Sequence, residues 1–565
     1  MKKAYNTTRN KLILYGEIVM NIFQPKLFSS LKSYSKKQFV SDLVAGVIVA
    51  IIALPLSIAL AIASGVSPEK GIYTAIVAGF VIAFLGGSNV NISGPTAAFA
   101  TIVAGIVAQF GTSGLVIATL MAGLILILMG VFRFGSLIKY IPHTITTGFT
   151  SGIALTIVIG QIKDFLGLTF PEGMPTVETI EKLEAIVHSI TTFNWQALLM
   201  GVIALAILIV WPKISKKIPG SLIAVVVGVV IVKVTGMEVN TVGDLYSISR
   251  ALPEFSLPSF SFETVKQLIP SAFTIAILAG IESLLSCVVS DGMIKDKHNS
   301  NTELIAQGVG NICSGLFGGI PATGAIARTA ANVKNGGRTP VAGIVHAAVL
   351  LLVLVVLMPY AAWIPMPVIA AILFMVAYNM CEWKQFVKIC KTAPKSDILA
   401  LVVTFVLTVV FDLVVAIAVG MIIAVVLFMK RMADVASIRT WTKGGENAPD
   451  SERLKEIPDN TTVIEFEGPM FFASSEKFNS ITFEKGVKVV ILRMRNVPAL
   501  DSTAMRVLNE IYSTCRKSDL TLVLSHTNEQ PLSVMKKAGF YDKVGAENFL
   551  PNIDEALSYA EKINK

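Results

Sequence analysis

Long apolar runs recur along this 565-residue chain up to about residue 432, and they constrain its fold more than any other feature. Twelve of them approach the length of a membrane-spanning helix, which needs about 20 mostly apolar residues. Two further runs, after Pro95 and Pro321, are shorter. The sequence therefore predicts a polytopic α-helical membrane protein, whose long runs lie near residues 43–63, 71–86, 114–132, 144–162, 195–211, 219–235, 268–290, 303–319, 341–358, 363–380, 397–411 and 413–430.

The composition also favours a membrane protein. Hydrophobic residues make up 53% of the sequence and charged residues 15%, below the share of about 25% in soluble domains. A soluble protein this apolar would expose large hydrophobic patches. The net charge of +9 would suit nucleic-acid binding, but basic residues in short loops also hold those loops in the cytoplasm. We expect membrane lipid as the surrounding partner and no nucleic acid.

The character of the sequence changes near residue 435, after which charges are dense and no apolar run could span a bilayer. We predict a cytoplasmic leader over residues 1–40, a transmembrane domain over 41–432, a linker over 433–454 and a soluble domain over 455–565. The leader is not expected to be a signal peptide, because the first long apolar run begins only near Leu43.

Charges in the predicted loops favour one orientation. If the leader is cytoplasmic, the loops on that side are basic and the longest loops on the other side are mostly acidic, as the positive-inside rule requires. We therefore expect an even number of crossings in the cell inner (plasma) membrane, with both termini and the soluble domain in the cytoplasm. The basic residues are Arg133, Lys139, Lys213, Lys216, Lys217, Lys295, Lys297, Lys334, Arg338, Lys384, Lys388, Lys391 and Lys395, and the acidic ones are Asp164, Glu172, Glu178, Glu181, Glu184, Glu238, Asp244, Glu254 and Glu263.

The two short segments indicate an internal repeat. They read NVNISGPTAAFATIVAGIV (89–107) and GGIPATGAIARTAANVKNGG (318–337). A Gly-Gly pair comes just before the first segment and opens the second, and each segment contains a Pro followed by small residues. Thr96 lies 41 residues after Pro55 (96 − 55), and Thr323 lies 41 after Glu282 (323 − 282). Interrupted hydrophobic segments at corresponding places in two halves are typical of transporters built from inverted repeats.

A helix that starts inside the membrane leaves about four backbone N–H groups unpaired, and these carry partial positive charge. Two such starts that face each other form an anion site with few charged side chains. Small residues allow the backbone to approach a ligand closely. The repeat therefore predicts a small inorganic or carboxylate anion as substrate.

Several stretches resemble the SulP (sulfate permease) family of anion transporters. The resemblance is carried in the first half by DLVAGVIVAIIALPLSIALAIASGVSPEKGIYTAIVAGF (42–80) and ISGPTAAFA, and in the second by AGIESLLSCVVSDGM and QGVGNICSGLFGGIPATGAIARTAANVKNGGRTPVAG. The C-terminal segment resembles the STAS domain that follows the transporter in that family. The resemblance implies a seven-plus-seven inverted-repeat fold of about fourteen segments with two half-helices, an α/β STAS domain and a homodimer.

Glu282 is a lone carboxylate among apolar residues in AILAGIESLLSCVV. An ionisable side chain at that depth is costly and is a functional hypothesis by default. Glu282 is therefore the candidate site for the coupling ion, which the resemblance gives as H⁺ or Na⁺. The alternative is a structural partner for Arg328, and the two interpretations are compatible.

Arg328 matches the arginine that lines the anion site in relatives, and a guanidinium can bind an oxyanion through two hydrogen bonds. The alternative is an arginine at a helix end that snorkels to the cytoplasmic surface. Leu56 stands where animal relatives often carry Gln, which leaves the substrate open, and Asp412 is expected in a loop. The predicted substrate-binding residues are Ser93, Gly94, Pro95, Thr96, Ala97, Thr323, Gly324, Ala325, Ala327 and Arg328, with simple helix packing as the alternative for each small one.

The soluble domain alternates predicted strands and helices, as in TTVIEFEG, VKVVILRM and LTLVLSH between helical segments. Asp501 is a good N-cap for the helix that it opens. The resemblance makes Asp501, Ser502 and Thr503 candidate regulatory residues, because the matching loop carries a phosphorylatable hydroxyl in regulators of this fold. A cytoplasmic protein is the expected partner of this domain.

The leading functional hypothesis is a secondary active transporter of sulfate or a related small anion, coupled to H⁺ through Glu282. A Na⁺-coupled bicarbonate importer and a dicarboxylate transporter are alternatives within the class, and a channel or a membrane-anchored STAS signalling scaffold is an alternative outside it. We expect no enzyme, because the sequence has no GxxxxGK[ST] motif or catalytic triad. The five cysteines form no CxxC pair and no His lies at metal-ligand spacing, so neither a metal nor a cofactor is expected.

Overall fold

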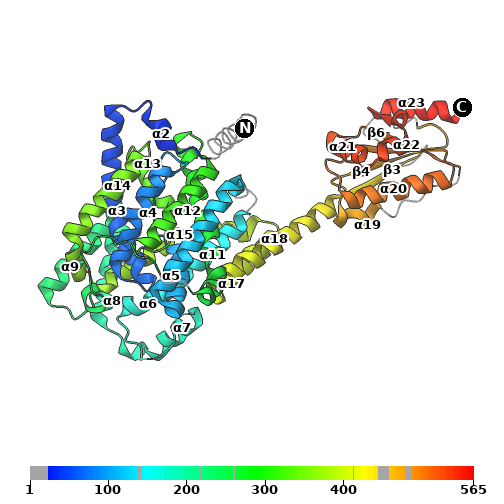
Figure 1. The fold of residues 1–565 in the computed structure, drawn as a ribbon. Helices are drawn as coiled ribbons and strands as arrows, with labels where there is room; N and C mark the ends of the chain where they lie inside the picture. Colours follow the sequence, from blue (N-terminus) through cyan, green and yellow to red (C-terminus); the bar gives the residue numbers. More distant parts are fainter. Residues whose placement is uncertain are drawn as a thin grey trace. The chain divides into compact units, whose positions relative to one another are not determined.

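The structure is a computed structural model that describes residues 23–565 apart from 137–141, 172, 177, 216–217, 259–260, 412, 443–456, 479–482 and 484–485. It divides into two compact units, Met1–Met421 and Ile422–Lys565 (Figure 1). Some predictions fall outside the described residues, namely those for the leader up to residue 22, Lys139, Glu172, Lys216, Lys217, Asp412 and linker residues 443–454.

The first unit consists almost entirely of helices, and each predicted apolar stretch coincides with one. Among the described residues, nine helices are long and apolar enough to cross a membrane. The helices of the first half are α2 (Lys26–Leu31), α3 (Lys36–Ala63), α4 (Pro68–Leu85), η1 (Ala97–Phe99), α5 (Ala100–Val131), α6 (His143–Leu166), α7 (Thr179–His188), η3 (Ile190–Thr192), α8 (Trp195–Ile214), α9 (Gly220–Thr235) and α10 (Val242–Leu245). Those of the second half are α11 (Phe262–Ile294), α12 (Ser300–Leu316), α13 (Ile326–Lys334), α14 (Val341–Leu357), η4 (Met358–Trp363), α15 (Met366–Met380), α16 (Trp383–Thr392) and α17 (Lys395–Val410). Helix α18 (Leu413–Val435) begins in the first unit and continues into the second.

The two short segments form half-helices of different kinds. The first begins as η1 and continues into α5, where Gly111 (φ 66°, ψ −172°) interrupts the helical conformation. Glycine adopts this positive φ without steric cost, so the short segment and the predicted run at 114–132 are two helical stretches within α5. The second half-helix, α13, ends just before Gly336, which also has positive φ (96°).

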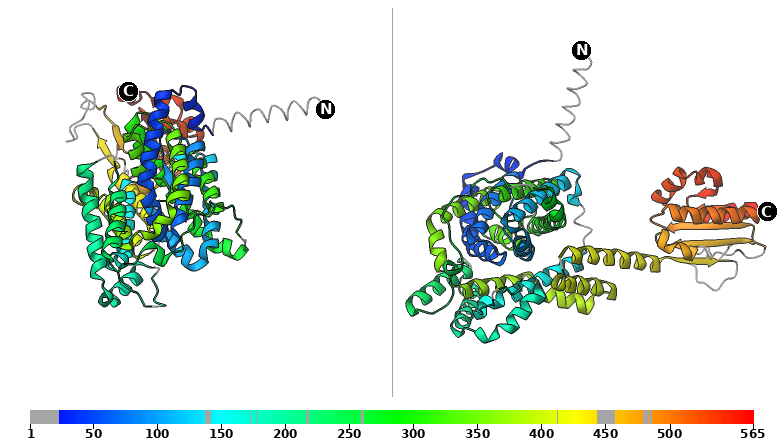
Figure 2. Two further views of the ribbon diagram at one scale, coloured as in Figure 1. Left: turned by 90° about the vertical axis from the view of Figure 1, so that its left-hand side faces the viewer. Right: turned by 60° about the horizontal axis from the view of Figure 1, so that its bottom comes forward.

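The two halves of the first unit interlock. Helix α5 of the first half packs on α11 and α12 of the second, and α14 of the second half packs on α3 and α4 of the first. These helices form one group together with α13, while α6, α8, α9, α15 and α17 pack mainly on one another in a second group. The right-hand view of Figure 2 shows both groups. The interlocked pattern is the arrangement of helices that the predicted repeat requires.

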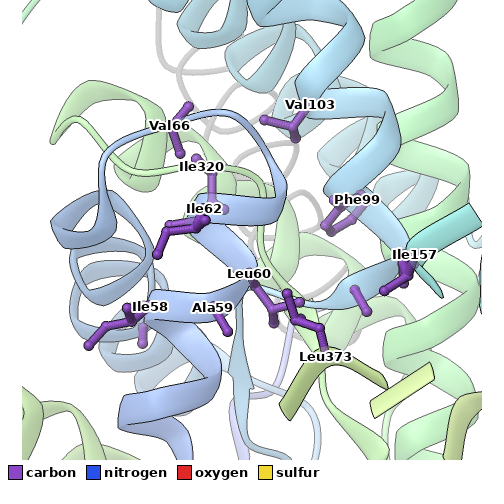
Figure 3. Packing of buried hydrophobic residues seen from close by; sticks show 14 of the residues in the cluster. Ile58, Ala59, Leu60, Ile62, Val66, Phe99, Val103, Ile157, Ile320 and Leu373 are labelled. Carbon is purple, nitrogen blue, oxygen red and sulfur yellow. The ribbon is translucent and has the colours of Figure 1, made fainter. Parts of the chain in front are cut away.

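One buried apolar cluster connects the two groups of helices. Phe99 at the start of the first half-helix, Leu60 of α3, Ile157 of α6 and Leu373 of α15 all belong to it (Figure 3). Each of these side chains is at most 4% exposed. The start of the first half-helix is therefore packed on one side by apolar side chains from both groups.

The second unit is an α/β domain with a five-stranded sheet in the order β3-β4-β5-β6-β7, in which β3 is antiparallel to β4 and the other pairs are parallel. The strands are β3 (Ser437–Trp441), β4 (Thr461–Glu467), β5 (Val489–Asn496), β6 (Thr521–Ser525) and β7 (Phe549–Leu550). The helices are η6 (Phe472–Ser474), α19 (Ser475–Phe478), α20 (Ser502–Lys517), α21 (Glu529–Lys537), α22 (Phe540–Val544), η7 (Ala546–Asn548) and α23 (Ile553–Asn564).

Alternate residues of the central strands pack on opposite faces of this sheet, as the period of two requires. Val490 and Leu492 lie in the cluster that includes Leu508 of α20, and Ile491 lies in the cluster that includes Ala556 of α23. Both faces are therefore covered by helices, as expected of parallel strands. Cys515 of α20 is fully buried, and burial raises the pKa of its thiol to about 12, so the side chain packs as an apolar group.

Strand β3 lies in the segment that the sequence predicted as a linker. Its five residues pair in register with β4, from Ser437 opposite Glu467 to Trp441 opposite Val463. The strand is short and reads SIRTW, with two exposed polar residues, so its hydrophobic pattern is too weak to recognise without its partner.

Candidate functional site

A two-stranded antiparallel ladder joins the two half-helices at their starts. Ser93 and Gly94 form β1, Thr323 and Gly324 form β2, and Ser93 pairs with Gly324 while Gly94 pairs with Thr323. The amide of Ala325 donates to the carbonyl of Ile92 at 2.8 Å and extends the ladder by one bond. The first turns that follow the ladder have no side-chain cap, because neither Thr96 nor Ala325 makes a capping bond.

Glu282 of α11 lies against the start of the first half-helix. The Thr96 hydroxyl donates to Glu282 Oε2 at 2.9 Å. Both side chains are partly accessible, whereas Ser93, Gly94 and Pro95 behind them are buried. The structure therefore brings the predicted coupling carboxylate next to a predicted substrate-binding hydroxyl.

Arg328 is buried, with 3% of its surface exposed, and does not snorkel to an aqueous surface. Its Nη2 donates to the Pro95 carbonyl of the other half-helix, and Nη1 has no hydrogen-bond partner in the described part of the chain. A Cβ on Gly94 would come within 2.5 Å of Nη1, so glycine at this position leaves the space that the guanidinium occupies. The positive charge of the second half-helix thus lies beside the backbone of the first.

Hydroxyl groups fix the ladder to the surrounding helices. Thr323 Oγ1 lies 2.7 Å from Ser283 Oγ and donates to the Ala279 carbonyl at 2.9 Å, and the Gly324 amide donates to Ser283 Oγ at 2.9 Å. Ser93 Oγ accepts from Gln307 Nε2 at 3.0 Å. The ladder is therefore held by α11 on the second strand and by α12 on the first.

A buried polar network that the sequence did not reveal lies next to the ladder. Asn91 Oδ1 accepts from Ser286 and from Thr329 at 2.8 and 3.0 Å, and Asn91 Nδ2 donates to Glu303 Oε1 at 2.8 Å. Glu303 is 1% exposed and also accepts from the amide of Gly87 at 2.9 Å. The residues are far apart in sequence, and the only signal for them is polar side chains within otherwise apolar helices.

The remaining predicted residues lie at the same place but differ in exposure. Ala97 and Gly324 are buried, Ala325 is partly accessible and Ala327 is exposed. All the predicted substrate-binding residues therefore lie on the ladder, at its two exits or on the first turns beyond it. Among the described residues no group of three or more His, Cys, Asp or Glu side chains could hold a metal ion.

The ladder lies within the two segments that indicated the repeat. Its strands are Ser93-Gly94 and Thr323-Gly324, and they run antiparallel, so Ser93 lies opposite Gly324 and Gly94 lies opposite Thr323. Aligning the two dipeptides in sequence gives an offset of 230 (323 − 93), three more than the offset of 227 (323 − 96) that matches Thr323 with Thr96.

The candidate regulatory residues lie at the start of α20 in the second unit. Asp501 Oδ1 accepts from the amide of Ala504 at 2.9 Å as a helix N-cap, and Oδ2 accepts from the amide of Phe472 at 2.9 Å. Ser502 is exposed and Thr503 is partly accessible in the first turn. Capping explains Asp501 fully, and the two hydroxyl residues remain candidates.

Comparisons with solved structures define the class of protein. Murine Solute Carrier 26 family member A9 (Slc26a9), described as an anion transporter in the inward-facing state, superposes with a TM-score of 0.86 over 97% of this chain and 95% of that chain at 20% identity. The transmembrane domain of a cyanobacterium bicarbonate transporter, BicA, superposes with a TM-score of 0.61 over 69% of this chain and 98% of that one at 32% identity. The fold is that of a polytopic, multi-pass membrane transporter with a C-terminal α/β domain, so the predicted fold class is confirmed.

Sequence comparisons then give the family. The sequence model of the Sulfate permease family matches residues 39–404, and that of the STAS domain matches residues 452–556. The chain belongs to the sulfate permease (SulP) family of anion transporters and carries a C-terminal STAS domain. It is a transporter and not an enzyme, as the sequence predicted.

Relatives in this family carry more than one substrate in their names. "Putative sulfate transporter YvdB" of Bacillus subtilis (strain 168) is 41% identical over 93% of this chain and 98% of that protein. "Bicarbonate transporter BicA" of Picosynechococcus sp. is 32% identical over 92% of this chain and 94% of that protein. The family therefore defines an anion as substrate and leaves the particular anion and the coupling ion open.

Proposed function

We propose that this protein is a secondary active transporter that moves a small oxyanion such as sulfate together with H⁺, and that Glu282 carries the proton. The observation that supports the proposal most directly is the hydrogen bond from Thr96 to Glu282 at the start of the first half-helix. It places a titratable group in contact with a donor that an anion would use.

The anion would bind between the two half-helices. Helix starts without side-chain caps present backbone N–H groups and partial positive charge. Arg328 adds a full charge that is already anchored on Pro95. A desolvated oxyanion is stabilised by such fixed donors, because no solvent or side chain has to reorganise when it arrives.

Protonation of Glu282 would change the site in two ways. Protonation removes a negative charge beside the anion. It also weakens the hydrogen bond from the Thr96 hydroxyl to the carboxyl group, so that this hydroxyl can donate to the substrate instead. A carrier that holds the anion without the proton has one more uncompensated negative charge in the membrane than a carrier that holds both, at a cost of several kcal/mol. The fully loaded and fully empty forms are the ones that cross, which couples the two fluxes.

The experiment is uptake of radiolabelled sulfate into proteoliposomes with an imposed pH gradient. Wild-type uptake should rise as the external pH falls, because protons then load Glu282 from outside. Glu282→Gln imitates the protonated form, so it should keep substrate binding and exchange but lose proton-driven accumulation. Glu263→Gln, at the exposed start of the same helix, is the matched control. Accumulation by Glu282→Gln in response to the pH gradient would contradict the proposal.

A Na⁺-coupled bicarbonate importer is the second candidate, because relatives 32% and 31% identical to this chain are named bicarbonate transporters. The same uptake assay separates the two, since this candidate requires Na⁺ and ignores an imposed pH gradient. A panel of anions that includes dicarboxylates tests the remaining substrate class. Absence of any transport, with binding of a cytoplasmic protein to the STAS domain, would favour a signalling scaffold.

We further propose that the protein is a homodimer in the inner membrane with both termini and the STAS domain in the cytoplasm. The excess of Lys and Arg in the loops predicted to be cytoplasmic supports this orientation, by the positive-inside rule. Single cysteines at Lys213 and Lys388 should resist an impermeant thiol reagent in intact cells, and one at Glu254 should react. Each single cysteine should be introduced into a variant from which the five native cysteines have been removed. Rapid labelling at Lys213 would reverse the orientation.

Ser502 and Thr503 are proposed as the surface through which the STAS domain is regulated. A phosphate there would lie at the N-terminus of α20, where negative charge is favourable. A cytoplasmic protein that recognises this end of the helix would respond to the added charge. Phosphomimetic Ser502→Asp should alter partner binding without changing the fold of the domain.

A further inference from the structure

An apolar pocket of about 300 Å³ lies between α3, α9 and the α14–η4 segment of the first unit. Its lining includes Pro55 and Ile58 of α3, Val229 of α9, and Met358 and Ile364 beyond α14. The volume is at the lower end of those seen for ligand pockets. The lining side chains are overwhelmingly hydrocarbon, so the pocket suits an apolar occupant and not the anion.

The pocket has a buried floor and an exposed rim. Ile58 and Met358 on the floor are each 2% exposed, whereas Val226 and Val230 of α9 are 50% and 54% exposed at the rim. Helix α3 and the α14–η4 segment are long and apolar enough to cross a membrane, and α9 is a shorter apolar helix. In a bilayer, an exposed apolar rim of this kind is expected to face lipid. A cavity lined in this way stays dry and accepts an apolar ligand.

Polar and aromatic groups mark one end of the pocket. Trp363 lines it, is 44% exposed and packs edge-to-face on Tyr360 with ring centroids 5.3 Å apart. The exposed Lys233, one turn beyond Val229 and Val230 on α9, holds its Nζ 5.0 Å from the centroid of the Trp363 ring. Tryptophan, tyrosine and lysine with this exposure are typical of the boundary between hydrocarbon and lipid head groups.

We propose that this pocket binds an acyl chain of an anionic phospholipid whose phosphate pairs with Lys233. The apolar lining accepts the chain, the open rim gives it access from the bilayer, and Lys233 supplies the complementary charge at the level of the head group. A soluble apolar ligand would not need the cation, and a zwitterionic lipid would gain less from it. The inference does not depend on which anion or coupling ion the protein uses.

The site lies where the two groups of helices meet, since α3 and α14 belong to one group and α9 to the other. A chain inserted there fills the space between them and resists a change in their separation. Because the two groups pack mainly within themselves, motion of one against the other has to alter this space. The composition of the membrane would therefore influence the rate of transport through this pocket.

The test uses the full chain in nanodiscs that contain phosphatidylglycerol or phosphatidylcholine with a photoreactive acyl chain. Phosphatidylglycerol should label peptides from Leu222–Val230 and Val353–Ile364. Lys233→Ala should weaken competition by unlabelled phosphatidylglycerol about fivefold, since a lysine near a lipid surface contributes about 1 kcal/mol. Labelling by phosphatidylcholine should be weaker and unaffected by this change. Val226→Trp, which blocks the rim, should abolish labelling by both lipids.

Matched controls exist elsewhere in the same unit. Lys163 lies over Phe170 at 4.9 Å, much as Lys233 lies over Trp363, so Lys163→Ala should leave labelling of the pocket unchanged. Val202 of α8 is 49% exposed away from the pocket, and Val202→Trp controls for an added ring. Phosphatidylglycerol competition that is equal in wild type and Lys233→Ala, or labelling spread evenly over the lipid-facing helices, would overturn the proposal.

Discussion

The starts of the two half-helices have similar backbones but carry different side chains. When the ladder dipeptides Ser93-Gly94 and Thr323-Gly324 are aligned in sequence, Thr96 matches Ile326 and Ala98 matches Arg328, each at the offset of 230 (326 − 96 and 328 − 98). Thr96 contacts Glu282, whereas Ile326 is 43% exposed and apolar. Ala98 is buried and neutral at the place where the second half carries its guanidinium.

Both charges of the candidate site come from the second half, and both contact the first. Glu282 receives the hydrogen bond of Thr96, and Arg328 donates to the carbonyl of Pro95. The repeat therefore supplies two similar helix starts, while the substitutions between its halves make one start neutral and the other charged. A transporter can therefore have two halves with similar backbones and still bind its substrate mainly through the charged side chains of one half.

The largest effect should come from removing the charge that only the second start carries. Arg328→Ala should weaken anion affinity roughly ten- to a hundredfold, because a hydrogen bond to a charged group is worth on the order of 1.5–3 kcal/mol. Binding to the purified protein measures it, and Arg328→Lys should recover part of the loss. If Arg328→Ala binds the anion as tightly as wild type while remaining folded, the charged start does not bind substrate.

A second change should disturb the same charge from the opposite start. Gly94→Ala places a Cβ 2.5 Å from Arg328 Nη1, and relief of such overpacking costs about 1–3 kcal/mol. We expect anion affinity to fall roughly tenfold. Gly105→Ala, where a Cβ meets nothing within 4 Å, is the control in the same half-helix. Equal affinities for the two alanine variants would show that the position of the guanidinium is unimportant.

Exchange of the side chains that differ at the first turn should have a smaller effect. Thr96→Val removes the hydroxyl that contacts Glu282, and loss of one hydrogen bond of about 1 kcal/mol predicts about fivefold weaker anion binding at acidic pH. Ile326→Val, at the corresponding position of the second start, should change affinity little. Titration of both variants with the anion would sharpen the comparison, and similar losses would argue that the starts are equivalent after all.

The smallest effect concerns the two hydroxyls within the ladder. Thr323→Val loses its contacts with Ser283 and Ala279, whereas Ser93→Ala loses one bond from Gln307. We expect Thr323→Val to lower the free energy of unfolding by about 1 kcal/mol more than Ser93→Ala, since each hydrogen bond contributes about 0.5–1.5 kcal/mol. Thermal unfolding in detergent measures both. A larger loss of unfolding free energy for Ser93→Ala would show that the side-chain hydrogen bond of the first strand matters more than those of the second.

Much of the fold could be predicted because the bilayer imposes simple rules on sequence. An apolar run of sufficient length has few alternatives to a spanning helix, so the predicted stretches coincide with helices. Asp501 was recognisable as an N-cap from its own residue type and its place before a helix. In contrast, β3 could not be recognised, because a short edge strand depends on a partner that lies more than twenty residues away.

Two kinds of residue in the candidate site could be predicted, namely those that stand out from their neighbours and those that belong to the two interrupted segments. Glu282 and Arg328 are isolated charges in apolar surroundings, which is itself the signal. Asn91, Ser286 and Thr329 carry no such signal, because polar uncharged residues are common in membrane helices and their bonds join three different segments. The pairing of Ser93-Gly94 with Thr323-Gly324 could not be predicted either, since small residues align almost equally well at several offsets.

The interlocked halves also have a consequence for biogenesis. The ribosome delivers Gly94 to the membrane 229 residues before its ladder partner Thr323 (323 − 94). At about 5–20 residues per second, the first strand waits roughly 10–50 s for the second. During that interval Ser93, Asn91 and the open start of the first half-helix lack the partners that α11, α12 and α13 later provide. These polar groups therefore remain without their final partners until α11, α12 and α13 have been synthesised.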